Sequence, residues 1–255
     1  MDLLQYFKKA EKGKWALGQF NFYDEEQLVG IIEAASRLKA PVILGTSERQ
    51  SKKVGLKKIV AQVAEYKRKY HHPVFLHLDH SRSFDYIIKA IASGYDSVHF
   101  DGSGLPLKEN VRIAKKVVNY AKKKKIPVEG EIETIQAVNR KKETLTDPAI
   151  ARKFLKETKV DTLAVTVGNF HGISKSGINP KLDLKRLERI KKVVGKTPLV
   201  LHGGSGTRRE DIRKAVRLGV VKINIGTEIK RAKTFSRVKK VVEEKIKLFG
   251  SNNKI

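Results

Sequence analysis

Three histidines, His80, His171 and His202, stand at the ends of three separate apolar runs, where each could bind a metal ion. Three nitrogen ligands that leave one position open are typical of catalytic zinc sites. Asp101 and Glu131 lie at the ends of two further apolar runs and could add carboxylate ligands. Because the chain contains no cysteine, a metal ion would have to be bound by histidine, aspartate or glutamate. These residue types predict a divalent metal site.

Each of these histidines has an alternative role as a hydrogen-bonded core residue without a ligand. Three of the seven histidines stand at equivalent strand ends, which favours the metal site over three unrelated core residues. We interpret the other four as inert. His71 and His72 are predicted in a loop, and His77 and His99 as strand residues hydrogen-bonded inside the sheet.

A glycine-rich turn follows the run that ends at His202. The stretch HGGSGTRREDI, residues 202–212, places three glycines and a serine before a predicted helix. Backbone N–H groups in such a turn, together with a helix N-terminus, can bind phosphate. The next apolar run contains Asn224 and is followed by Thr227, and both could complete the phosphate site.

Lys222 shares strand parity with Asn224, so it points inward if Val221 and Ile223 point outward. A buried lysine can form a Schiff base with a carbonyl substrate. The other interpretation, which we favour, is a structural ion pair in the interior.

The stretch PVFLHLDHSRSFD, residues 73–85, carries Asp79 and His80 side by side at the end of an apolar run. Side chains alternate between the two faces of a strand, so these neighbours cannot both reach one site from a regular strand. We therefore expect the strand to end at Asp79, with a turn that directs His80 toward the metal.

Eight short apolar runs alternate with amphipathic helical patterns, which indicates an α/β fold. Eight such repeats in 255 residues favour one (β/α)8 TIM barrel domain, residues 1–255, with a short N-terminal helix and a long C-terminal helix. The candidate residues follow these runs, as expected for a site at the carboxyl ends of barrel strands. The runs cover residues 16–20, 41–45, 73–79, 97–101, 127–132, 161–168, 198–203 and 220–226.

The composition excludes several classes of protein. No apolar run approaches the ~20 residues that a membrane helix needs, and the first residues, MDLLQYFKKAEKGKW, lack the apolar core of a signal peptide. We expect a cytoplasmic protein. The net charge of +27 attracts polyanions, but the lysines occur as doublets at helical spacing, so we expect solvated helix faces and no specific nucleic-acid partner.

Together these motifs resemble the class II, metal-dependent fructose-1,6-bisphosphate aldolases and the similar tagatose-bisphosphate aldolases. The resemblance covers nearly the whole chain. It rests on ALGQFN, PVILGTSE, HLDH, SFD, SGYDSVHFDGS, PVEGEIE, VGNFHG, PLVLHGGSG and KINIGTE.

The resemblance implies roles for individual residues. His80, His171 and His202 would bind the catalytic zinc, with Asp101 and Glu131 at a second or alternative metal position. Asp79 would carry protons to and from the C4 hydroxyl. The dihydroxyacetone phosphate end would be held by Gly172, Gly203, Ser205, Asn224 and Thr227, and Ser47 would contact the other phosphate. Lys175 and Lys222 also match family positions, which favours a supporting role for Lys222 over a Schiff base.

The activity implied is reversible cleavage of a ketose bisphosphate, by default fructose 1,6-bisphosphate, to dihydroxyacetone phosphate and glyceraldehyde 3-phosphate through a zinc-stabilised enediolate. Such a lyase acts in carbohydrate metabolism such as glycolysis. The implied cofactor is Zn²⁺, with another divalent metal as the alternative and a monovalent cation as a further ligand. The implied partners are a phosphorylated sugar and further copies of the chain in a homodimer or homotetramer, with no membrane.

The chain departs from the family after the fifth run, which continues as EGEIETIQAVNRKKETLTDP. Glu133 stands where the family has glycine, and Glu133 and Glu143 are the candidate substitutes for the family's acidic base. The family's distal-phosphate arginine segment is absent, and Arg49, beside Ser47, offers a replacement charge. These departures leave two alternatives: an aldolase for tagatose bisphosphate or a ketose monophosphate, or a degenerate barrel that binds a phosphorylated ligand or RNA without turnover.

Overall fold

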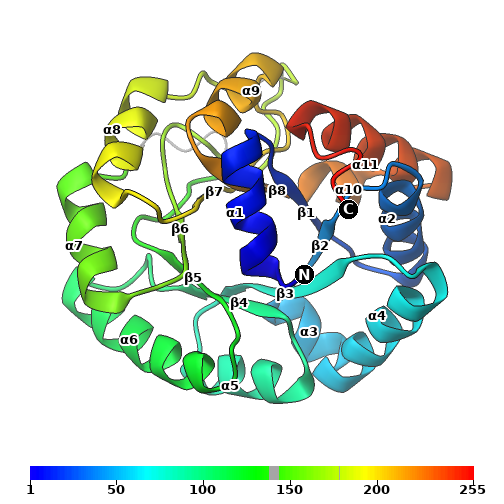
Figure 1. Ribbon diagram of the computed structural model, residues 1–255, viewed down its shortest axis with the longest axis horizontal. Helices are drawn as coiled ribbons and strands as arrows, with labels where there is room; N and C mark the ends of the chain where they lie inside the picture. The colour runs from blue at the N-terminus through cyan, green and yellow to red at the C-terminus, as the bar shows by residue number, and fades with distance from the viewer. Residues whose placement is uncertain (138–143, 178) are drawn as a thin grey trace.

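The computed structural model of the protein describes residues 1–137, 144–177 and 179–255, which form a closed barrel of parallel strands (Figure 1). The strands follow one another around the barrel in sequence order, and β8 pairs with β1 to close it. Each predicted run overlaps one strand, so the predicted (β/α)8 barrel is confirmed. The strands are β1 (Leu17–Asn21), β2 (Val42–Ser47), β3 (Val74–Ser81), β4 (Ser97–Asp101), β5 (Val128–Glu131), β6 (Thr162–Ala164), β7 (Leu199–Leu201) and β8 (Val220–Ile225).

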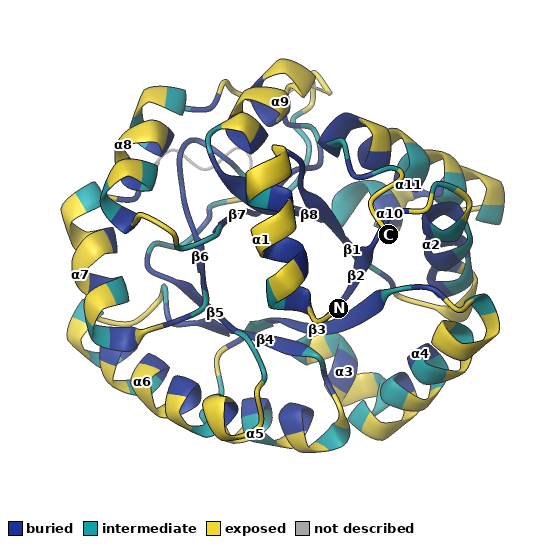
Figure 2. Ribbon diagram, viewed as in Figure 1, coloured by how far each residue is buried: buried dark blue, intermediate teal, exposed yellow. Residues whose placement is uncertain are grey.

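Helices cover the outside of the barrel, each with one buried and one exposed side (Figure 2). The helices among the described residues are α1 (Leu3–Gly13), α2 (Glu25–Arg37), α3 (Glu48–Val54), α4 (Leu56–Tyr70), α5 (Phe84–Ser93), α6 (Leu107–Lys123), α7 (Pro148–Thr158), α8 (Leu184–Val194), α9 (Arg209–Arg217), α10 (Thr227–Arg231) and α11 (Phe235–Phe249).

Helix α2 illustrates how the sequence sets these elements. It begins after Asp24, whose side chain accepts a hydrogen bond from the Gln27 N–H and so satisfies one free donor of the first turn. Apolar residues recur along one face at a spacing of three and four, which places them against the barrel. This face of α2 is buried, and its members are Leu28, Ile31, Ile32 and Ala35.

Strand β6 is shorter than its apolar run, which extends from residue 161 to residue 168. The loop after β5 accounts for the difference. The Thr146 N–H donates to Thr166 O at 2.8 Å, and the Thr166 N–H donates to Thr146 Oγ1 at 2.9 Å. Because these backbone groups of Thr166 are bonded to the loop, the strand ends earlier than the apolar pattern predicts.

The N-terminal helix α1 lies across the amino ends of the strands (Figure 1). Asp2 and Gln5 begin it with a capping box, in which each side chain accepts from the other's backbone N–H. Its apolar face packs on side chains from the strands in one buried cluster: Leu3, Tyr6, Phe7, Ala10, Trp15, Leu17, Ile43, Phe75 and Val221. Helix α1 therefore covers the end of the barrel opposite the predicted site.

The predicted long C-terminal helix corresponds to α11, which packs beside α2 (Figure 1). Its residue Val238 lies close to Gly30 of α2. A Cβ added to Gly30 would lie 3.1 Å from Cγ1 of Val238. Among the described residues, no helix combines the length and apolar character needed to cross a membrane.

Candidate active site

A cavity of about 280 Å³ opens at the carboxyl ends of the strands. In barrels of this kind the loops after the strands build the active site. Most of the residues predicted from the sequence meet here. The cavity is lined by Asn21, Tyr23, Ser47, Asp79, His80, His171, Gly172, His202, Gly203, Ser205, Asn224, Gly226, Thr227 and Lys230.

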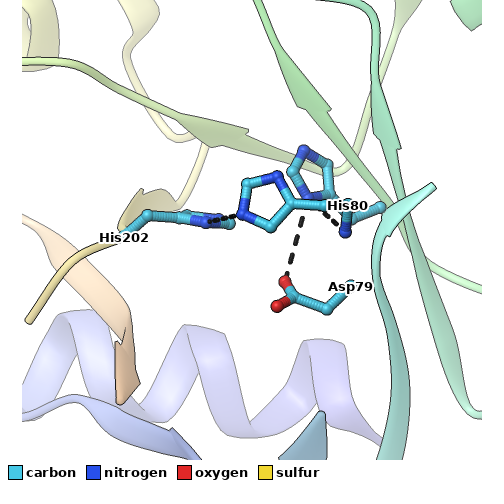
Figure 3. Close-up of side chains that lie close together, drawn as sticks. Asp79, His80 and His202 are labelled. Carbon is cyan, nitrogen blue, oxygen red and sulfur yellow. Dashed lines mark hydrogen bonds and ion pairs between the residues drawn. The ribbon is translucent and has the colours of Figure 1, made fainter. Parts of the chain in front are cut away.

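The three predicted histidines come together in this cavity, although they derive from β3 and from the loops after β6 and β7. The ring centroid of His80 lies 4.6 Å from that of His202 and 5.0 Å from that of His171. The rings of His171 and His202 are 6.1 Å apart. Figure 3 shows His80 and His202 reaching toward each other, with Asp79 beside them. The three rings thus line one cavity, and ligand atoms of His80 and His202 lie within 4.8 Å of one another together with those of Asp79 and His99.

Hydrogen bonds on the far sides of two rings fix which nitrogens face each other. His202 Nε2 is 2.7 Å from Glu129 Oε1, and His80 Nδ1 is 3.3 Å from Asp101 Oδ2. An ionised carboxylate only accepts, so these nitrogens carry the protons and leave lone pairs on His202 Nδ1 and His80 Nε2. Those two atoms are 2.9 Å apart. Two lone pairs at this distance repel, so the contact would be stabilised by a proton on one of the nitrogens or by a cation that both rings could bind. The donor set fits a divalent metal.

The three carboxylates around His80 favour a positive charge at this place. Burial lowers the pKa of His80, but Asp79, Asp101 and Glu131 more than offset it and raise the pKa above its usual value. The pKa of His171, by contrast, is lowered to about 4 by burial and by the charges of His80 and His202. A neutral His171 keeps a lone pair for a metal ion, which imidazole ligands require.

Asp101 and Glu131 lie on the other side of His80. Glu131 Oε2 is 3.7 Å from His80 Nδ1, and these three residues bring ligand atoms within 4.8 Å of one another. They line a second cavity of about 270 Å³, together with Arg82, Thr134, Ile135 and His171. Both carboxylates thus face the Nδ1 side of His80, while His202 lies on the Nε2 side. They form a separate group of potential ligands.

Asp79 is almost fully buried and is held by two amides. Asn21 Nδ2 donates to its Oδ2 at 2.8 Å, and Asn224 Nδ2 donates to its Oδ1 at 3.2 Å. Burial raises the pKa of the Asp79 carboxyl, but the charges of His80 and His202 and a hydrogen bond from His99 outweigh burial and hold the pKa well below its usual value. Asp79 is therefore an ionised group, fixed in orientation, at the wall of the cavity.

The predicted phosphate turn has a backbone that only glycine can adopt. Gly203 has a φ of +66°, and a Cβ there would lie 2.0 Å from the backbone oxygen of Phe170. Ser205 Oγ accepts from the Glu228 N–H at 3.2 Å, which ties this turn to the segment after β8. The turn is thus a tight, polar wall beside the histidines, as a phosphate site requires.

Sequence reasoning did not single out Glu129, which lies inside the barrel below the histidines. Its Oε2 pairs with Lys222 Nζ at 2.6 Å, while its Oε1 holds His202. The favoured interpretation of Lys222 as a partner in an interior ion pair agrees with this contact. The signal for Glu129 was its spacing, because it stands two residues before Glu131 and shares its inward parity.

Strand β3 differs from its prediction. It continues to Ser81 instead of ending at Asp79. His80 lies within the strand but has a left-handed φ of +49°, which turns its side chain toward His202. The expected turn toward the site is present, but a single twisted residue makes it. The two strand histidines, His77 and His99, are hydrogen-bonded in the barrel as predicted, through Ser97 Oγ and the His80 N–H.

Several predicted residues lie outside the cavity lining. Lys175 and Arg49 are exposed, and neither lines the cavity. Glu133 Oε2 accepts from Thr146 Oγ1 at 2.7 Å, so its carboxylate lies against the loop and not in the cavity. Burial raises the pKa of Glu133. Glu143 lies outside the described residues.

A larger cavity, of about 940 Å³, lies at the opposite end of the barrel, between α1, α6 and α7. It contains none of the predicted site residues. Its walls are lysines, apolar side chains, and acids such as Asp96 and Asp161, which accept backbone hydrogen bonds from Leu76 and Val128. Since those acids are occupied in the fold, the smaller cavity is the candidate site.

Comparison with known proteins finds aldolases, both by sequence and by structure. The sequence model of the family described as fructose-bisphosphate aldolase class-II matches residues 1–237. The YdjI aldolase from Escherichia coli K12 is 33% identical, with a TM-score of 0.88 over 99% of this chain and 98% of that one. A putative fructose-1,6-biphosphate aldolase from Coccidioides immitis is 26% identical, with a TM-score of 0.90 over 99% and 97%. The fructose-bisphosphate aldolase from Campylobacter jejuni, 21% identical with a TM-score of 0.84 over 99% and 95%, is similar in fold.

Proposed function

Because the chain belongs to the class II fructose-bisphosphate aldolase family, we propose that it is a metal-dependent lyase that reversibly cleaves fructose 1,6-bisphosphate to dihydroxyacetone phosphate and glyceraldehyde 3-phosphate. The family implies a divalent metal and a sugar phosphate substrate. The observation that carries the proposal is the convergence of three imidazoles and one fixed carboxylate on a single cavity.

In this proposal His80, His171 and His202 hold a Zn²⁺ ion, or another divalent metal. When bound, the ion supplies a Lewis acid for the ketone and adjacent hydroxyl oxygens of the substrate and stabilises the negative charge that develops there. Glu129 and Asp101 hold two of the rings in the orientation that presents their lone pairs. Such partners behind a ligand fix its tautomer and its direction.

Asp79 moves the proton at the C4 hydroxyl. It accepts this proton as the C3–C4 bond breaks and returns it when the bond forms in condensation. The amides of Asn21 and Asn224 support this role because they fix both carboxylate oxygens in the cavity wall. The low pKa of Asp79 keeps its carboxylate ionised at neutral pH, as an acceptor must be.

The two ends of the substrate need separate anchors. We assign the dihydroxyacetone phosphate end to the polar wall formed by Gly172, Gly203, Ser205, Asn224 and Thr227. The other phosphate is assigned to Ser47, which pairs with Asp79 in the register of β2 and β3 and so lies on the C4 side. A monovalent cation beside a phosphate is a further part of the proposal. Lys175 is assigned a role only when substrate is bound, since it is exposed outside the lining.

One observation favours a second candidate, a ketose monophosphate. Lys230 is the single lysine or arginine among the described residues that line this cavity. A bisphosphate carries about twice the charge of a monophosphate, and Arg49 lies outside the lining. The second candidate is therefore an aldolase whose substrate has a phosphate only at the dihydroxyacetone end.

Cleavage of a substrate panel decides between these candidates. Zinc-loaded protein is incubated with fructose 1,6-bisphosphate, tagatose 1,6-bisphosphate or fructose 1-phosphate, and dihydroxyacetone phosphate is measured by enzymatic reduction. We expect kcat/KM for fructose 1,6-bisphosphate to exceed that for the monophosphate by at least about tenfold, the effect of one charge-assisted hydrogen bond. A faster monophosphate supports the second candidate. If none of the three sugars is cleaved, the result contradicts the proposed aldolase activity. It then favours a barrel that binds a phosphorylated ligand or RNA without turnover.

The proposal also includes the form in which the enzyme acts. We propose a homodimer or homotetramer of 1–255 barrel domains in the cytoplasm. Light scattering of the purified protein at several concentrations measures the mass in solution, and a monomer throughout would contradict the oligomer.

A further inference from the structure

We infer that Glu48, at the start of α3, is a positioning residue for the metal ligand His80: its carboxylate locks the left-handed backbone that turns His80 into the cavity. This inference rests on the proposed function, because it concerns the metal site of that reaction. Glu48 lines neither of the two cavities beside His80, so it acts through the chain and not by contact with substrate.

The need for a lock follows from the neighbours Asp79 and His80. Both must reach the same cavity, but consecutive residues of a strand point to opposite faces. The structure resolves this conflict with a φ of +49° at His80. Left-handed backbone is sparsely populated for residues other than glycine, and it persists only where the surroundings enforce it.

A bulge in β3 accompanies this twist. Leu78 pairs with Val98 of β4, but the next pair joins Ser81 to Phe100, so three steps along β3 match two along β4. Bulges of this kind re-aim a side chain and are frequent beside active sites. The extra residue loses its regular ladder partners, so other groups must hold it.

Hydrogen bonds hold the bulge on both sides of His80. Before it, the His80 N–H donates to His99 Nδ1 at 3.2 Å. After it, Glu48 Oε2 accepts from Ser81 Oγ at 2.7 Å and from the Arg82 N–H at 3.0 Å. One carboxylate oxygen thus binds both residues that follow His80, which fixes the direction in which the chain leaves the twist.

Glu48 is itself well placed for this role. It directly follows Ser47, the residue of β2 that pairs with Asp79 of β3. Ser47 caps α3 by accepting from the Gln50 N–H at 3.2 Å, and the other oxygen of Glu48 pairs with Lys52 one turn along the helix. The carboxylate therefore stands on a hydrogen-bonded strand-to-helix corner, facing the bulge.

The test compares metal binding by wild-type protein and by Glu48→Ala. Both are stripped of metal, titrated with Zn²⁺ against a competing chelator, and reloaded with Co²⁺ for visible absorption spectra, which report the ligands of the bound ion. We expect Glu48→Ala to raise the Zn²⁺ dissociation constant about 10- to 100-fold, as for other residues that support metal ligands. The Co²⁺ spectrum per bound ion should change as His80 leaves its position. Thermal unfolding of the metal-free proteins verifies that both are folded.

Two variants sharpen the comparison. Glu48→Gln keeps an acceptor oxygen for Ser81 and Arg82, so its Zn²⁺ affinity should stay within about threefold of wild type. A change this small is distinguishable from the 10- to 100-fold loss expected for Glu48→Ala. The matched control is Glu33→Ala on α2, which also removes a half-buried glutamate with two partners, Tyr70 and Lys239. It should leave both affinity and spectrum unchanged.

The outcomes separate this inference from the proposed function. Wild-type protein that binds no metal would overturn the proposed function and this inference with it. Wild-type protein that binds metal, with Glu48→Ala matching its affinity and its Co²⁺ spectrum, would overturn the inference alone. If Glu48→Ala fails to fold, Ser81→Ala carries the test by removing one of the two bonds, and an unchanged affinity in that variant would also overturn the inference.

Discussion

Changing Asp79 to asparagine is expected to lower kcat for ketose bisphosphate cleavage by about a thousandfold, the midrange effect of removing a general base. Asparagine keeps the shape of the side chain and one acceptor oxygen for Asn21 or Asn224, but it cannot take the C4 hydroxyl proton. Since proton transfer belongs to the transition state, KM should change much less than kcat. Steady-state kinetics of metal-loaded Asp79→Asn measure both.

The matched control for this change is Asp147→Asn. Asp147 caps α7 by accepting from the N–H groups of Ala149 and Ile150, and asparagine caps equally well. Its activity should equal that of wild type. A loss below about tenfold for Asp79→Asn, with metal content unchanged, would contradict the assignment of proton transfer to this carboxylate.

Changing Lys222 to methionine is expected to lower the free energy of unfolding by about 3–5 kcal/mol, the cost of leaving a buried charge without its partner. Lys222 and Glu129 are both almost fully buried, and Lys222 Nζ lies 2.6 Å from Glu129 Oε2. Methionine fills a similar volume, so the loss reports the charge and not a cavity. Urea unfolding of the metal-free proteins measures it without the added stability of a bound ion.

The double variant Lys222→Met with Glu129→Gln tests the pairing directly. A neutral glutamine needs no cationic partner, so the double variant should recover a large part of the stability lost in Lys222→Met. A coupled interior pair would be contradicted if the double variant recovers none of the lost free energy of unfolding. It would also be contradicted if Lys222→Met alone loses less than about 1 kcal/mol.

The apolar pattern was sufficient to predict the barrel. Strands such as β2 and β7 carry short runs of Val, Ile and Leu, the composition typical of parallel strands buried on both faces. The site followed from the same pattern, because the carboxyl ends of all strands meet at one mouth of the barrel. His171 and His202 could thus be placed together although 31 positions of sequence separate them.

The twist at His80 could not be predicted in its detail. Because side chains alternate along a strand, the sequence predicts that Asp79 and His80 would point to opposite faces. It does not predict which residue changes its backbone so that both reach the cavity. The answer depends on Glu48, which belongs to a different strand-to-helix corner. Such contacts between distant segments are absent from any local pattern.

The contacts of Glu129 and Glu133 could not be predicted from the sequence, for two different reasons. The contacts of Glu129 depend on the register of the barrel strands, which places its carboxylate between His202 and Lys222. Glu133 follows the last residue of β5 by two positions, where strand parity no longer fixes direction, and the loop turns its carboxylate to Thr146. The sequence supplied the residue types in both cases, while their partners depend on tertiary structure.

Metal dependence of the cleavage reaction tests whether this barrel works as a metal-dependent lyase. Purified protein with its metal content measured is assayed with fructose 1,6-bisphosphate before chelation, after chelation, and after addition of one equivalent of Zn²⁺. We expect chelation to abolish the activity, Zn²⁺ to restore it, and borohydride added with substrate to leave it intact. Activity that survives complete removal of the metal, or that borohydride destroys by modifying Lys222, would contradict the account.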